Sequence, residues 1–135
     1  MASALVFGAS GQIGQALVSG LLRDGWQGNA ISRAPRQAVS GLNWIQADLC
    51  QPTGLPLDVD AVFSCGPLDH ISTWYVGAAG LRARVVAFGS TSVEVKRDSS
   101  DPHERALAAR LATAEARLFE SAHARGAAAS VLRPT

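Results

Sequence analysis

The sequence contains a single tyrosine, Tyr75, and a single lysine, Lys96, which lie too far apart to share a helical turn. Acid–base chemistry that pairs a phenol with an ammonium group on one helix is therefore excluded. Cysteine occurs only at Cys50 and Cys65, too few for a four-cysteine metal site, so we expect two reduced thiols and no metal. No apolar run approaches the length that spans a membrane. The formal net charge of +1 gives no reason to expect a nucleic-acid or acidic membrane partner.

The composition is that of an ordered protein with a well-buried core. Apolar residues make up 47% of the 135 residues and charged residues only 17%, which argues against a disordered chain. The length fits one domain, so residues 1–135 are predicted to form a single domain. The first apolar run begins by Ala4, which leaves no room for a signal peptide and predicts a cytoplasmic protein.

A glycine-rich turn near the start of the chain is the most informative feature. The apolar run Ala4–Phe7 leads into Gly8, Gly11 and Gly14, and a helical pattern follows at once. In such a strand–turn–helix unit the first glycine allows the turn, the second lets the backbone approach a pyrophosphate, and the third lets helix and strand pack closely. The free amides and dipole of the helix then favour an anion. A purely structural turn is the alternative, but the strand before and the helix after favour a dinucleotide site.

Apolar strands alternate with helical stretches along the whole chain, which predicts an α/β fold with a doubly wound parallel sheet of six strands in the order 3-2-1-4-5-6. Prolines and glycines in 33–41 and 49–59 predict connections with little or no helix. Two apolar stripes are expected to be buried: Ile13, Leu17, Leu21 and Leu22 on the first helix, and Leu107, Leu111, Ala114, Leu118 and Ala122 on the long helix. The predicted strands are Ala4–Phe7, Asn29–Ser32, Leu42–Gln46, Asp60–Ser64, Arg84–Phe88 and Ala129–Leu132, and the predicted helices are Gly11–Asp24, His70–Ala79 and Pro102–Arg125.

The end of the second strand predicts which dinucleotide is preferred. An acid at this position pairs with the ribose hydroxyls in NAD-selective proteins. No Asp or Glu occurs between Gly25 and Gln46, and Ser32, Arg33 and Arg36 occupy the region instead. Because a guanidinium suits a 2′-phosphate, the sequence favours NADP, with NAD and two solvated arginines as the alternative.

Five features, spread over the whole chain, resemble those of the extended and atypical short-chain dehydrogenase/reductases, the NAD-dependent epimerase/dehydratase-like group. None is decisive alone, but all five occur in the expected order. They are the spacing Gly8-x-x-Gly11-x-x-Gly14, Asp48 after the third strand, Ser64-Cys65-Gly66-Pro67 after the fourth, Phe88-Gly89-Ser90-Thr91-Ser92-Val93 after the fifth, and Ala114-Glu115-x-x-Leu118 followed by Val131-Leu132-Arg133-Pro134-Thr135.

The resemblance implies a Rossmann-like fold that binds NADP or NAD. It implies that Asp48 meets the adenine amino group and that residues after the fourth strand line the cofactor. The cofactor-binding residues that follow from the motifs are Gly8, Ser10, Gly11, Gln12, Ile13, Gly14, Ser32, Arg33, Asp48, Leu49, Cys65 and Gly66.

The chain departs from the family at the catalytic pair. The positions expected for the Tyr and the Lys fall on Leu107 and Leu111, so the usual acid–base pair is absent. Ser90 or Thr91 would polarise a substrate oxygen, and His70 would supply a proton because its ordinary pKa suits acid–base work. The alternatives are that the hydroxyls cap a loop and that His70 is a surface or capping residue.

Two functions therefore stay open: an oxidoreductase acting by hydride transfer on an unknown small molecule, and a non-catalytic NADP-binding sensor or regulatory module. Relatives continue beyond the Arg133-Pro134-Thr135 exit into a substrate-binding region that this sequence lacks, as a shortened product or as a minimal domain. The resemblance is also compatible with a homodimer.

Overall fold

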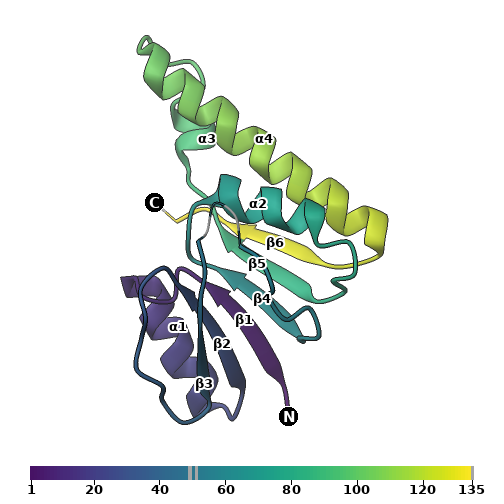
Figure 1. Cartoon of the computed structure of the whole chain (residues 1–135). Helices are drawn as coiled ribbons and strands as arrows, with labels where there is room; N and C mark the ends of the chain where they lie inside the picture. The colour runs from purple at the N-terminus through teal and green to yellow at the C-terminus, as the bar shows by residue number, and fades with distance from the viewer. Residues whose placement is uncertain (49, 51, 135) are drawn as a thin grey trace.

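The computed structural model describes residues 1–48, 50 and 52–134, so Leu49 and Thr135, named above from the motifs, lie outside the described residues. A six-stranded sheet with the order β3-β2-β1-β4-β5-β6 forms the centre of the molecule (Figure 1). Every neighbouring pair of these strands is parallel, so the predicted α/β doubly wound fold and strand order are confirmed. The strands are β1 Ser3–Phe7, β2 Gln27–Ser32, β3 Leu42–Gln46, β4 Ala61–Ser64, β5 Arg84–Phe88 and β6 Ala129–Leu132.

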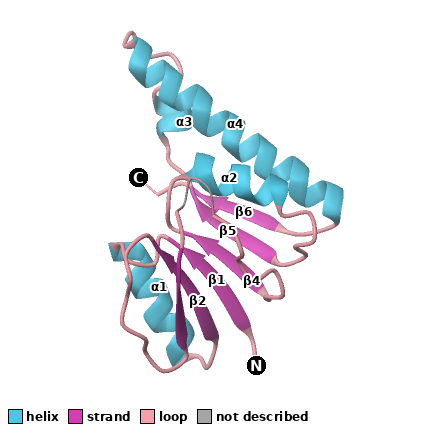
Figure 2. Cartoon of the chain, viewed as in Figure 1, coloured by secondary structure: helices cyan, strands magenta, loops and turns pink. Residues whose placement is uncertain are grey.

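Helices cover both faces of the sheet (Figure 2), as a parallel sheet requires. The helices of the described residues are α1 Gln12–Arg23, α2 Leu68–Gly77, α3 Ser92–Val95 and α4 Pro102–Arg125. The single turn α3 was not predicted. The connection 33–41 contains no helix, and neither do residues 50 and 52–60, which confirms the two short crossings expected from their prolines and glycines. No helix in the described part of the chain combines the length and apolarity needed to cross a membrane.

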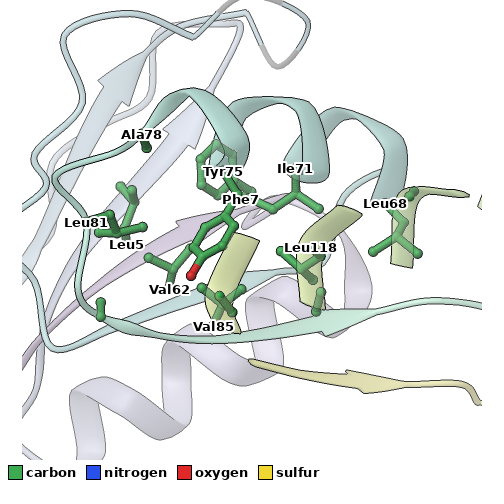
Figure 3. Packing of buried hydrophobic residues seen from close by; sticks show 14 of the residues in the cluster. Leu5, Phe7, Val62, Leu68, Ile71, Tyr75, Ala78, Leu81, Val85 and Leu118 are labelled. Atoms are coloured by element: carbon green, nitrogen blue, oxygen red, sulfur yellow. The ribbon is translucent and has the colours of Figure 1, made fainter. Parts of the chain in front are cut away.

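The larger core lies between the sheet and the pair α2 and α4. Alternate residues of β1 point to opposite faces, so Leu5 and Phe7 enter this core while Ala4 and Val6 pack with α1. Figure 3 shows Tyr75 and Ile71 of α2 directed at the strands. The buried residues of the larger core include Leu5, Phe7, Val62, Leu68, Ile71, Tyr75, Leu81, Val85 and Leu118.

Both ends of α4 are defined by local chemistry. The Asp101 carboxylate accepts a hydrogen bond from the amide of His103 at 2.9 Å, and Pro102 occupies the first turn, where no amide is needed. Gly126 ends the helix with φ +67°, a conformation that favours glycine. The predicted stripe on α4 is confirmed, with Ala114, Leu118 and Ala122 buried and Leu107 and Leu111 half-buried.

The predicted stripe on α1 was wrong at one position. Ile13 is 48% exposed, whereas Gly14, Val18 and Leu21 are buried. The helix starts so close to β1 that only a glycine fits at position 14: a Cβ there would lie 2.1 Å from the Gly8 carbonyl oxygen. Gly14 is therefore the residue of this turn that faces the sheet, and the neighbouring Ile13 side chain faces outwards.

Gly14→Ala is expected to destabilise the protein by about 1–3 kcal/mol, because the added methyl group forces α1 away from the Gly8 carbonyl. The free energy of unfolding, measured by circular dichroism in urea, checks this.

Gly20→Ala is the matched control in the same helix, since a Cβ at Gly20 would meet only Arg23 Nη2, at 3.9 Å. This control is expected to stabilise the protein by up to about 1 kcal/mol through helix propensity. Equal effects of the two substitutions would contradict the close-packing explanation.

Candidate functional site

The glycine turn brings the ends of β1 and β4 together. Gly8 has φ +71°, and a Cβ at this position would lie 2.6 Å from both the Cys65 carbonyl carbon and the Gly66 nitrogen. The Cys65 amide donates to the Phe7 carbonyl at 2.9 Å, which extends the strand pairing up to the turn. The turn and the β4 exit, which the sequence assigned separately to the cofactor, therefore form one continuous surface.

The start of α1 is open to solvent. A Cβ at Gly11 would meet only the Gly8 carbonyl oxygen, at 3.6 Å, so packing within the protein does not require this glycine. No side chain caps the helix, and Ser10, Gln12 and Ile13 are exposed around it. The first amides of a helix have no partner within the helix, so this terminus can receive an anion.

A cavity of about 230 Å³ joins the glycine turn to the end of β2. Arg36 Nε donates to Ser32 Oγ at 3.3 Å, and its guanidinium carbon lies 5.7 Å from the centre of the Trp44 ring. The exposed Arg33 also borders the cavity. The contact between Arg36 and the Trp44 ring was not predicted. The cavity is lined by Gly8, Ser10, Ile31, Ser32, Arg33, Ala34 and Arg36.

Asp48 follows β3 at the same edge of the sheet, because the carboxyl ends of parallel strands share one edge. It is exposed, and its Oδ1 accepts a hydrogen bond from the Cys50 amide at 2.9 Å. The carboxylate is therefore oriented by the backbone of its own loop.

Two of the three predicted catalytic side chains, Ser90 and His70, contact different neighbours. Ser90 Oγ accepts the Ser92 amide at 3.1 Å and lies 3.0 Å from Ser92 Oγ, which is the loop-capping arrangement given above as the alternative. Thr91 directly precedes α3 as its N-cap residue, and its side chain makes no capping hydrogen bond. His70, in the first turn of α2, lies with its Nε2 atom 3.7 Å from Cys50 Sγ. The proximity of Cys50 and His70 could not be predicted, because nothing in the sequence couples two residues twenty positions apart.

The only tyrosine, Tyr75, and the only lysine, Lys96, do not line the cavity at the glycine turn. Tyr75 is fully buried in the larger core, with the Arg125 guanidinium 4.1 Å from its ring centre. Lys96 directly follows α3 as its C-cap residue. Tyr75 is thus a packing residue.

A buried carboxylate, missed by the sequence analysis, organises the opposite end of the same edge. Glu115 on α4 is only 6% exposed and receives two hydrogen bonds from Arg133, Nε to Oε1 at 2.9 Å and Nη2 to Oε2 at 2.5 Å. Arg133 Nη1 also donates to Glu94 of α3 at 3.1 Å. The hydrogen bond to Glu115, above all, raises the pKa of the Arg133 guanidinium. The signal available in the sequence was an acid next to the apolar stripe of α4.

The two cysteines are free thiols in different surroundings. Cys50 is exposed in the loop after β3, whereas Cys65 is half-buried against the glycine turn. Burial raises the pKa of the Cys65 thiol.

No protein-family model matches the sequence, and no curated protein sequence matches it. Solved structures do match. A UDP-galactose 4-epimerase shares 19% identity over 97% of this chain and 55% of its own, with a TM-score of 0.74. Vestitone reductase from alfalfa (Medicago sativa) shares 18% over 98% of this chain and 56% of its own, with a TM-score of 0.67. MoeE5 in complex with UDP-glucose and NAD shares 25% over 96% of this chain and 52% of its own, with a TM-score of 0.67.

The chain thus spans only about half the length of these proteins. Nearly all of it superposes on them, so the chain has the Rossmann fold of the epimerases and short-chain-type reductases. The fold expected from the sequence resemblance is confirmed.

Glu115→Gln is expected to lower the free energy of unfolding by about 2 kcal/mol, because a buried carboxylate with two charge-assisted hydrogen bonds is replaced by a neutral amide. Urea unfolding followed by circular dichroism measures the loss. Glu94→Gln, which removes the exposed carboxylate on the other side of Arg133, is the control and should cost less than about 1 kcal/mol. A loss at Glu115 no larger than that at Glu94 would show that the pair is not the stabilising contact.

Proposed function

We propose that this chain is an NADP-preferring dinucleotide-binding domain of an atypical epimerase/dehydratase-like oxidoreductase. The observation that carries the proposal is the single cavity that joins Gly8 and Ser10 of the glycine turn to Ser32, Arg33 and Arg36 at the end of β2. One end of this surface suits a pyrophosphate and the other suits a phosphorylated ribose.

The residues at the pyrophosphate end fit such a group. Gly11 leaves a space that a Cβ would fill without touching anything but the Gly8 oxygen, so the missing side chain is best explained by a ligand that approaches the backbone. The uncapped amides of α1 would hold the phosphates, with Ser10, Gln12 and Ile13 around them. Asp48, Cys65 and Gly66 would line the adenosine and nicotinamide sides, and Leu49 belongs to the same proposal on sequence grounds alone.

The residues at the ribose end favour the 2′-phosphate. A phosphate takes a planar guanidinium well, and Arg36 is already oriented by Ser32 and Trp44. No carboxylate from residues 26–45 is present to pair with a free ribose hydroxyl. The structure of MoeE5 contains NAD, which supports a nicotinamide dinucleotide as the class of ligand, while the choice of NADP depends on the arginines.

The bound dinucleotide would supply a hydride to, or take one from, a carbon–oxygen centre of a small molecule. Ser90 and Thr91 would hold the substrate oxygen, and His70, water or a residue outside this chain would move the proton. The substrate-binding region would also lie outside this chain, since the similar structures are nearly twice as long.

A non-catalytic NADP sensor is the second candidate, and two observations favour it. The Tyr-x-x-x-Lys pair is absent from the sequence, and the Ser90 hydroxyl is already engaged by Ser92.

Isothermal titration calorimetry of the chain with NADPH and NADH tests the binding proposal. We expect NADPH to bind more tightly than NADH. Arg33→Asp is expected to lower the affinity for NADPH at least about tenfold, with little effect on the affinity for NADH, because a charge-assisted contact to the 2′-phosphate is lost. Arg117→Asp on α4, an exposed position outside the cavity, makes the same change of charge and is the control. Equal affinity for both dinucleotides, or an equal loss in both variants, would contradict the assignment of the phosphate to the arginines.

Turnover separates the two candidate functions, provided that the protein assayed includes the substrate-binding region. NADPH oxidation is measured by absorbance with a panel of small aldehydes and ketones, for the wild type and for Ser90→Ala. Oxidation that Ser90→Ala reduces at least about tenfold is expected for the oxidoreductase, whereas NADPH binding without oxidation of any panel member favours the sensor.

A further inference from the structure

Cys50 and His70 form a contact that the proposed dinucleotide site does not use. The loop after β3 carries Cys50, and the first turn of α2 carries His70, with Sγ and Nε2 separated by 3.7 Å. Cys50 is exposed, so a small molecule can reach its sulfur atom. A thiol beside an imidazole is the arrangement that activates cysteine in many proteins.

The surroundings of the imidazole indicate which nitrogen carries the proton. His70 Nδ1 is buried and has no hydrogen-bond partner. A buried lone pair without a partner costs less than a buried N–H without one, so the neutral ring with its proton on Nε2 is favoured. In this tautomer the Nε2–H group is the one next to the Cys50 sulfur, 3.7 Å away. A hydrogen-bond donor at this position stabilises a thiolate more than a thiol.

We propose that Cys50, activated by His70, is a reactive thiol that exchanges with small neutral organic disulfides. The Cys50 thiol loses its proton to solvent, and the thiolate attacks one sulfur of the disulfide. A new sulfur–sulfur bond forms at Cys50 as the bond in the reagent breaks, and the departing thiolate takes a proton from solvent. No net oxidation or reduction occurs, because one disulfide replaces another.

A cavity beside the sulfur indicates the class of molecule. It has a volume of about 390 Å³ and lies between the loop after β3 and the outer side of α2. Apart from Cys50, none of the described residues that line it carries an ionisable side chain, and Leu55, Leu57, Trp74 and Ala78 give it an apolar wall. A disulfide with an apolar or aromatic group is therefore the better fit.

Two carboxylates accept hydrogen bonds from the backbone amides of the pair. Asp48 Oδ1 accepts the Cys50 amide at 2.9 Å, and Asp69 Oδ1 accepts the His70 amide at 3.1 Å. Both carboxylates repel an anionic reagent, which again favours a neutral one. Both also repel the negative charge of a Cys50 thiolate. Stabilisation of the thiolate consequently depends on the N–H of His70, which makes His70 a positioning residue that can be tested.

Cys65 provides the control within the same molecule. It is half-buried against the glycine turn, whereas Cys50 is exposed, so the Cys65 sulfur is less accessible. Burial also raises the pKa of the Cys65 thiol above its ordinary value, which lowers its thiolate fraction.

Stopped-flow reaction of the chain with dithiodipyridine, without any nucleotide, tests the proposal. The wild type is expected to show two phases, with the faster at least about tenfold faster than the slower at neutral pH. Cys50→Ser should remove the fast phase, and Cys65→Ser should leave it unchanged. A fast phase that survives in Cys50→Ser overturns the proposal.

The role of His70 is tested by the rate of the fast phase in two variants. His70→Leu removes the N–H beside Cys50 Sγ and should slow the fast phase at neutral pH at least about threefold. His70→Gln keeps an N–H at nearly the same place and should recover most of the rate. An unchanged rate in His70→Leu, or no recovery in His70→Gln, would overturn the role of His70, and urea unfolding confirms that each variant is folded. Because no dinucleotide is present, failure here is distinct from failure of the proposed function.

Discussion

The close approach of three backbone segments determines most of this structure. The end of β1, the end of β4 and the start of α1 meet at a point where two Cβ atoms are missing, at Gly8 and Gly14. With any larger residue at position 14, the helix would clash with the carbonyl of position 8. Because α1 starts this close to β1, it lies flat on one face of the sheet, and its uncapped end faces the edge where all the parallel strands finish.

In the second half of the molecule, ionic contacts of Arg133 hold the elements together. The segment after β5 must turn away from the sheet, form α3 and reach the start of α4. Arg133, just beyond β6, holds a carboxylate from each of α3 and α4. The guanidinium therefore fixes three elements at once, while the glycine turn fixes its three elements by having no side chains.

The sequence predicted the fold well because the fold depends on local patterns. Short apolar runs, the glycines and the position of Pro102 each act within a few residues, and the strand order follows from the way parallel crossovers are built. Ile13 was misplaced because helical periodicity takes no account of how close the sheet lies. The Glu115–Arg133 pair and the Cys50–His70 contact join residues on different elements, eighteen and twenty positions apart, so no spacing rule could reveal them. The contact of Arg36 with Trp44 depends on the path of the loop between β2 and β3, which no periodicity describes.

The three tryptophans occupy three distinct environments, and this has a spectroscopic consequence. Trp74 on α2 contacts Phe7, with ring centres 4.8 Å apart, and borders the apolar cavity beside Cys50. Trp44 on β3 lies beneath the Arg36 guanidinium, and Trp26 packs with the core on the α1 side. The intrinsic fluorescence of the protein is thus the sum of three partly buried indoles, one beside the Cys50 cavity, one beside Arg36 and one on the α1 side. Tryptophan emission can therefore respond to changes at either cavity without any added label.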